Sequence, residues 1–96
     1  MSDPAISQAV LTTAHASRYL QQLCKHFQHK RPVSFDPQQG HIAFSHGTCA
    51  LNAEGDTLML RLEAVDAEAM PQLQDVVARH LVRFAFREDL TVVWNA

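Results

Sequence analysis

The sequence predicts an α+β domain: a single antiparallel sheet with two helices packed on one face, in the order β-α-β-β-β-β-α-β. Two segments repeat apolar residues at helical spacing, and several short segments alternate apolar and polar residues. All three glycines fall between the alternating segments. The connections between these strands are short, which favours antiparallel pairing because parallel strands need long crossovers.

The chain has 96 residues, and we expect one domain spanning 1–96. Hydrophobic residues make up 47% and charged residues 19%, a composition typical of a folded domain with its own core. Residues 1–8 are small and polar, so we expect them to be flexible.

The first strand is predicted over Ala9–Ala14, where Val10 and Thr12 alternate with their neighbours. Ser17 is a candidate N-cap for the first helix. We expect this helix to end near Lys30, because Pro32 disfavours helical geometry in the residue before it. Its buried stripe is predicted to be Leu20, Leu23, Cys24 and Phe27.

Four short strands follow in the prediction, over Val33–Phe35, His41–Ser45, Thr48–Ala53 and Thr57–Ala64. The last of them has the clearest pattern, since Leu58, Leu60 and Leu62 fall on one face. Turn residues separate all four strands.

The second helix is predicted to be capped by Asp66 and to become regular near Met70, because Pro71 removes a donor close to its start. Its apolar face consists of Leu73, Val76, Val77, Leu81 and Phe84. Arg79 and Arg83 fall on its solvent side. A last strand is predicted over Leu90–Trp94.

The two cysteines, Cys24 and Cys49, belong to different predicted elements and form no CxxC motif. The first residues carry neither a basic region nor an apolar signal core, so we expect a cytoplasmic protein with both thiols reduced in the core. No apolar run is long enough to span a membrane, and we expect no membrane partner.

The net charge is −2 with the six histidines neutral. An acidic domain is a poor candidate for nucleic-acid binding, and we expect none. The sequence contains no glycine-rich phosphate loop, no dinucleotide fingerprint and no Gly-x-Ser-x-Gly nucleophile motif. It therefore predicts neither a cofactor nor a set of catalytic residues.

One local cluster points to function: two histidines beside cationic residues on the first helix. The candidate ligand-binding residues are Arg18, Lys25, His26, His29 and Lys30. Together they would attract a phosphate, a carboxylate-rich molecule or an acidic partner. The alternative interpretation is that these charges only compensate the negative end of the helix dipole and form a solvated surface.

A metal site is a second hypothesis. His26 and His29 are three residues apart and would lie side by side on a helix, where two imidazoles can share a metal ion. With His80 as a third ligand they would form the centre of a metal-dependent enzyme. Alternatively, His80 is a packed histidine bonded to backbone or to a carboxylate, because its neighbours at helical spacing are apolar.

Several segments resemble the bacterial family of unknown function DUF2218. The matching segments are Arg18–Lys30, Val33–Phe35, Gly47–Leu51, Val76–Glu88 and Trp94. The resemblance transfers no established role to any residue. Some members of that family occur beside, or joined to, siderophore-interacting flavin reductases. The resemblance therefore implies a binding or accessory module in iron or siderophore handling, with a siderophore or such a reductase as its partner.

A third hypothesis is a plain protein-interaction module that forms a homodimer through an edge or a face of the sheet.

Overall fold

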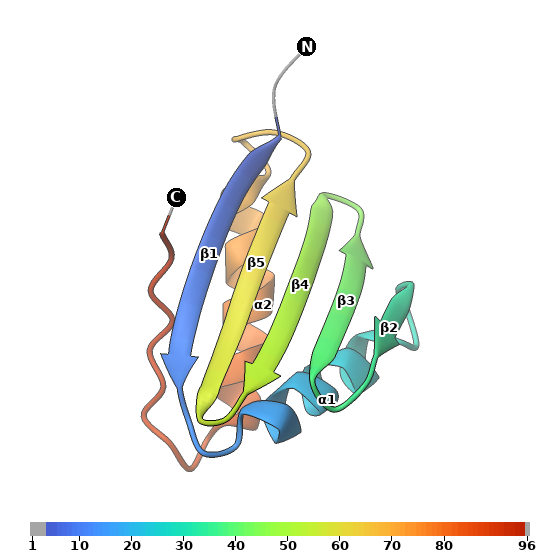
Figure 1. Ribbon diagram of the computed structural model, residues 1–96. Helices are drawn as coiled ribbons and strands as arrows, with labels where there is room; N and C mark the ends of the chain where they lie inside the picture. The colour runs from blue at the N-terminus through green and yellow to red at the C-terminus, as the bar shows by residue number, and fades with distance from the viewer. Residues whose placement is uncertain (1–3, 96) are drawn as a thin grey trace.

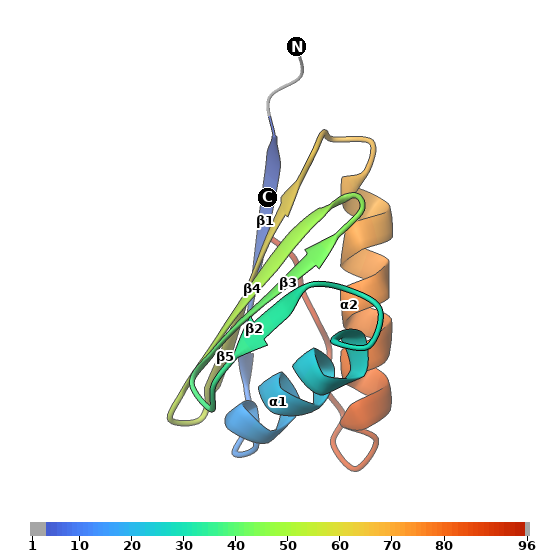
Figure 2. The ribbon, with the colours of Figure 1, turned by 90° about the vertical axis from the view of Figure 1, so that its right-hand side faces the viewer.

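The computed structural model describes residues 4–95. Its elements are β1 (Ala5–Thr12), α1 (Ala16–Phe27), β2 (Val33–Phe35), β3 (Gln39–Phe44), β4 (Gly47–Glu54), β5 (Thr57–Ala64) and α2 (Met70–Phe84). The strands form one antiparallel sheet in the order β1-β5-β4-β3-β2 (Figure 1). Both helices lie against the same face of the sheet (Figure 2). The predicted α+β class and the single sheet with helices on one face are confirmed.

The core lies between the sheet and the helices, and β5 supplies its centre. Leu58, Leu60 and Leu62 are at most 1% exposed, while the residues between them face the open side of the sheet. Leu60 is paired with Ala9 of β1 on one side and with Leu51 of β4 on the other. This register places buried side chains from three adjacent strands on one face, as the alternating pattern predicts.

Helix α1 buries its predicted stripe against β3 and β4. The approach is close at Gly40, where an added Cβ would lie 2.7 Å from the Cys24 sulfur. Cys24 and Cys49 are both buried free thiols, as predicted. Burial raises the pKa of the Cys24 thiol to about 11, and burial raises the pKa of Cys49 as well.

The N-terminal prediction was wrong in part. Residues 1–3 lie outside the described residues, but residues 5–8 belong to β1 and pair with β5. The buried positions of this strand begin at Ser7. Because Ser7 is polar, the alternation of apolar and polar residues cannot be recognised in this part of the sequence. The Ser7 hydroxyl donates a hydrogen bond to the carbonyl of Asn95, 3.1 Å away, which satisfies it at this buried position.

Helix α1 also differs from the prediction at both ends. His15, not Ser17, is the N-cap residue, and the Ser17 hydroxyl instead donates a hydrogen bond to the Pro37 carbonyl. The helix ends at Phe27 rather than near Lys30, because the amides of Lys30 and Arg31 both turn back to the Phe27 carbonyl.

Helix α2 begins at Met70, as predicted. The Asp66 carboxylate accepts a hydrogen bond from the amide of Ala69 at 2.9 Å, so it supports the helix start from outside instead of being its N-cap residue. No helix in the described part of the chain is long and apolar enough to cross a membrane.

The predicted last strand, Leu90–Trp94, does not form. The segment runs beside the outer edge of β1, but its backbone pairs with β1 only at a single bridge, between Gln8 and Asn95 (Figure 1). Leu90, Val92 and Trp94 pack against the core at alternate positions. The alternating pattern therefore indicates that one side of the segment is buried. The segment lacks the ladder of backbone hydrogen bonds that defines a strand.

Candidate functional site

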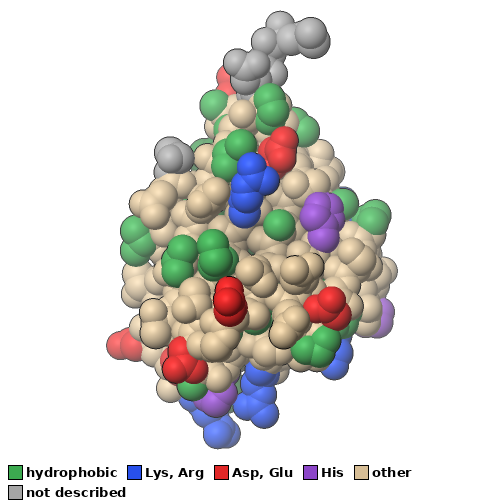
Figure 3. Space-filling model, in the orientation of Figure 1, with side chains coloured by type: hydrophobic (Ala, Val, Ile, Leu, Met, Phe, Trp, Pro, Cys, Tyr) green, Lys and Arg blue, Asp and Glu red, His purple; other side chains and the backbone are tan. Residues whose placement is uncertain are grey.

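The basic residues are concentrated around the helices. Of the eight Lys and Arg residues, only Arg61 lies on a strand. The other seven lie on the helices or in the segments that follow them: Arg18, Lys25, Lys30, Arg31, Arg79, Arg83 and Arg87. Figure 3 shows the opposite, open face of the sheet, where most of the surface is uncharged. The net-acidic chain thus has a helical layer that is locally basic.

Two histidines meet where the end of α1 approaches α2. The ring centroids of His26 and His80 are 4.8 Å apart, and the ring planes are tilted by 44°. The His26 ring also makes edge contacts with Phe27 and with Phe84 of α2, at 5.0 and 5.6 Å. Aromatic packing therefore fixes His26 in contact with the second helix.

His80 is half-buried, and its Nδ1 lies 2.6 Å from the carbonyl oxygen of Val76. We assign the ring proton to Nδ1, because a carbonyl oxygen can only accept. This is the packed histidine with a backbone partner that its apolar neighbours predict.

The surroundings of His26 are cationic. The His26 side chain is exposed overall, but its pKa is lowered first by desolvation where the ring packs against its neighbours, and then by the positive charges of His80, Lys30, Arg83 and His29. A hollow of about 300 Å³ is bordered by Arg79, Arg83 and His80, the residue whose ring contacts His26. We call His26, Lys30, Arg79, His80 and Arg83 the interhelix basic cluster.

The cluster has little internal compensation. The carboxylate of Asp75 lies 3.7 Å from Arg79, and both side chains are largely exposed. An exposed pair of this kind is weak and is screened by salt. Most of the positive charge of the interhelix basic cluster is therefore not neutralised by a nearby carboxylate, and it can attract an anion.

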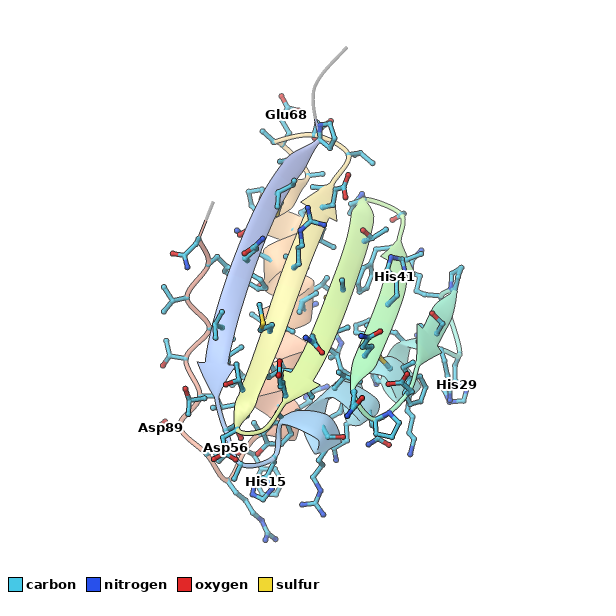
Figure 4. All side chains as sticks on the ribbon, viewed as in Figure 1. His15, His29, His41, Asp56, Glu68 and Asp89 are labelled. Carbon is cyan, nitrogen blue, oxygen red and sulfur yellow. The ribbon has the colours of Figure 1, made fainter. Side chains whose placement is uncertain are left out.

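The structure divides the predicted ligand-binding residues. His26 and Lys30 join the interhelix basic cluster. Arg18 borders a different hollow, near the start of α1. Lys25 is exposed in the last turn of α1. His29 is close enough to influence the pKa of His26, but it lies beyond the end of the helix (Figure 4).

The predicted metal set does not converge. Within residues 4–95, no group of three or more His, Cys, Asp and Glu side chains is placed to hold a metal ion. Of the predicted ligands, the structure brings His26 and His80 together without His29. The reason is local: α1 ends at Phe27, so the helical i,i+3 spacing that would align His29 with His26 is lost.

Two features of the helical layer were not predicted from the sequence. Arg79 and Arg83 were placed on the solvent side of α2 but not assigned to a site, although their spacing puts them on either side of His80. The second feature joins distant segments: the hydroxyls of Tyr19 and Thr13 both donate hydrogen bonds to the Glu88 carboxylate. No local pattern signals that contact.

The fold and the site define a class of small α+β domain, in which a five-stranded antiparallel sheet carries two helices on one face and a cationic surface on those helices. The chain belongs to the family described as "Uncharacterized protein conserved in bacteria (DUF2218)", whose model matches residues 8–95. The resemblance read from its motifs is thereby confirmed.

The chain is similar over nearly its whole length to a solved structure. That structure is the NMR structure of PA4090 from Pseudomonas aeruginosa, which is 37% identical in sequence and has a TM-score of 0.78. The match covers 94% of each chain. No curated protein matches the sequence. The comparisons thus establish the family and the fold.

Proposed function

We propose that this domain binds an anionic ligand through the interhelix basic cluster. One observation carries the proposal: His26 and His80 are in ring contact, Lys30 and Arg83 place positive charge near His26, and Arg79 and Arg83 border a hollow together with His80. Desolvation lowers the pKa of His26 first and the neighbouring positive charges lower it further, and a bound anion would oppose the second effect.

The side chains suit an oxygen-rich anion. The guanidinium groups of Arg79 and Arg83 offer planar pairs of donors that match a carboxylate or a phosphate. His26 can donate a further hydrogen bond, and it becomes a charged donor when it takes up a proton. The hollow of about 300 Å³ has room for a small oxyanion or for one acidic group of a larger molecule.

Within this class we propose an iron carrier as the ligand. Catecholate and carboxylate siderophores present several anionic oxygens, which is the chemistry that the interhelix basic cluster would recognise. The association of the DUF2218 family with siderophore-interacting reductases supports the choice, as context rather than as geometry.

Calorimetric titration of the intact protein with inorganic phosphate and with citrate tests the anion site. We expect binding of at least one probe and a loss of about tenfold or more in affinity in a His26→Gln, Arg83→Gln variant, since charge-assisted bonds are the strong ones. Arg61→Gln, which removes a cation from the open sheet face, is the matched control. Absence of binding to both probes, or equal losses in the variant and the control, contradicts the proposal.

The iron carrier is tested separately with a tris-catecholate siderophore, with and without iron. We expect it to bind more tightly than citrate and to lose affinity in the His26→Gln, Arg83→Gln variant. If it binds no better than citrate, the iron assignment fails while the anion site stands.

The open face of the sheet favours a second candidate, a homodimerising interaction module. It exposes Ile6, Val10 and Met59 at 42, 60 and 42%, and Val10 and Met59 border a hollow of about 210 Å³. A second copy would cover these apolar side chains. Light scattering should then give a dimer mass that Val10→Asp reduces to a monomer mass; a monomer at all concentrations contradicts this candidate.

A further inference from the structure

The helical layer has a second hollow, separate from the interhelix basic cluster. It has a volume of about 550 Å³ and lies between the start of α1 and the segment after α2. Arg18 and Tyr19 border it from α1, and Phe84, Phe86 and Arg87 border it from the end of α2 and the residues that follow. We call this space the Phe86 hollow.

The wall of the Phe86 hollow is fixed by a polar clasp. The carboxylate of Glu88 accepts hydrogen bonds from Tyr19 and from Thr13, whose hydroxyl lies 3.0 Å from both carboxylate oxygens. Thr13 in turn accepts a hydrogen bond from the His15 amide at 3.1 Å. Tyr19 and Thr13 are buried, so the clasp holds the residues after α2 against the start of α1. A site built on such a wall needs little reorganisation on binding.

The rim of the Phe86 hollow carries an aromatic side chain that is exposed to solvent. Phe86 is 76% exposed, the highest value among the exposed large hydrophobic residues of the described chain. The guanidinium carbon of Arg87 lies 5.5 Å from its ring centroid, close enough for a cation–π contact. A flat apolar molecule that covered Phe86 would remove the exposed ring surface from water. The Arg87 guanidinium would then lie close to the bound molecule.

The charges around the Phe86 hollow indicate the net charge of a ligand that would bind there. Two guanidinium groups, of Arg18 and Arg87, line the hollow together with one carboxylate, that of Glu88, and the His15 imidazole also borders it. The Glu88 carboxylate is already bonded to two hydroxyls, which lower its pKa and hold it ionised. The excess of one positive charge, together with the aromatic walls, fits a ligand that is both planar and singly anionic.

We propose that the Phe86 hollow is a binding site for a small planar aromatic monocarboxylate. Its ring lies against Phe84 and Phe86, and its carboxylate pairs with Arg18 and Arg87. A volume of about 550 Å³ is ample for two fused rings and an acid group. The inference does not depend on the interhelix basic cluster, although Phe84 contributes to both places.

NMR titration of the intact protein with 1-naphthoate tests this site. We expect saturable shifts at the amides of Phe86 and Arg87, and weaker binding of two partial analogues. Cyclohexanecarboxylate keeps the charge without the aromatic face, and 1-naphthalenemethanol keeps the rings without the charge. Phe86→Ala should weaken 1-naphthoate binding about threefold to tenfold, as expected for loss of an aromatic contact.

Matched variants separate the site from the rest of the surface. Val93→Ala removes another exposed apolar side chain, outside the Phe86 hollow, and should leave the affinity unchanged. Arg87→Gln should weaken binding, whereas Arg61→Gln on the open sheet face should not. Phosphate binding by the interhelix basic cluster should survive Phe86→Ala, so failure of one site is distinguishable from failure of the other.

Four results overturn the inference: no saturable shifts with 1-naphthoate, shifts centred on Val10 and Met59 instead, an affinity indifferent to Phe86→Ala, or equal binding of all three molecules. Sedimentation of the free protein supplies a further check. A dimer that Phe86→Ala dissociates would show that a second copy covers Phe86, and would also overturn the proposal.

Discussion

The rings of His26 and His80 lie 4.8 Å apart and join the last turn of α1 to α2. One histidine is anchored by the Val76 carbonyl, and the other is held by aromatic edges. Protonating both rings in this position is unfavourable, since Lys30, Arg83 and His29 add further positive charge near His26. The contact therefore couples any anion at this place to the uptake of a proton.

Anion binding should strengthen as the pH falls. The pKa of His26 is lowered in the free protein, and an anion would raise it, so the bound state takes up a proton. Sulfate keeps its full charge between about pH 7.5 and 6, so the logarithm of its association constant should rise as the pH falls through this window. Calorimetry in buffers of different ionisation enthalpy measures the proton uptake. In His26→Gln the dependence should be reduced, and an unchanged slope contradicts the assignment.

The same histidine should make the free protein less stable in mild acid. Its folded pKa is below the unfolded value of about 6.5, so the unfolded chain binds more protons in that window. Its contribution to stability is thus present at pH 7.5 and lost as the pH falls below about 6.5. The melting temperature of His26→Gln should fall less than that of the natural protein between pH 7.5 and 5.5. His41→Gln, on the exposed side of β3, is the control and should follow the natural protein.

Gly40→Ala should destabilise the fold. The added methyl group would lie 2.7 Å from the Cys24 sulfur and 3.3 Å from a Leu20 methyl carbon. Overpacking of this kind costs about 1–3 kcal/mol in the free energy of unfolding. Adding Cys24→Ala removes the sulfur, so the double variant should be more stable than the sum of the two single changes predicts. Urea unfolding of the three variants measures the coupling, and strict additivity would show that the contact is not the cause.

Tyr19→Phe should raise the pKa of Glu88. The hydrogen bond from the Tyr19 hydroxyl is the main cause that lowers this pKa, and Thr13 contributes less. A carboxyl with a lowered folded pKa stabilises the protein above its unfolded pKa, and this contribution is lost as the pH falls through the folded value. Carbon-detected NMR titration of the Glu88 side chain should show the pKa moving back toward about 4.3, the ordinary glutamate value. An unmoved pKa would rule out the Tyr19 contact as its cause.

Both thiols should be unreactive in the folded protein. Burial raises the pKa of Cys24 to about 11, and Cys49 is fully buried beside Leu62 of β5. Thiolate is the reactive form, so a disulfide reagent at pH 8 should label neither residue until the protein is unfolded. Unfolding in denaturant should then release two reactive groups per chain, and rapid labelling under native conditions would contradict the burial.

The sequence predicted what depends on local periodicity. The alternation of Leu58, Leu60 and Leu62 and the stripe containing Leu20 and Cys24 are buried as expected, because one face of a strand or a helix carries the signal. Met70 likewise begins α2, since Pro71 is tolerated only in a first turn.

What the sequence could not predict depends on tertiary contacts. His26 and His80 lie far apart in the chain, and only the crossing of α1 over the sheet beside α2 brings them together. His29 was misplaced because the turn after Phe27 ends the helix early. The clasp from Tyr19 to Glu88 joins the start of α1 to the segment after α2, and no local sequence pattern around either residue predicts this contact.

The bridge between Gln8 and Asn95 also affects which edge of the sheet is open to pairing with another chain. One edge strand of the sheet is β2, which has only three residues and is too short to template another strand. At the opposite edge, the final segment runs alongside the eight residues of β1 but pairs with that strand only at Gln8. Leu90, Val92 and Trp94 hold the segment against the core, where it stands in the way of another chain. Removing the segment would open the whole outer edge of β1 to pairing with a second strand, so a truncation before Leu90 should promote aggregation.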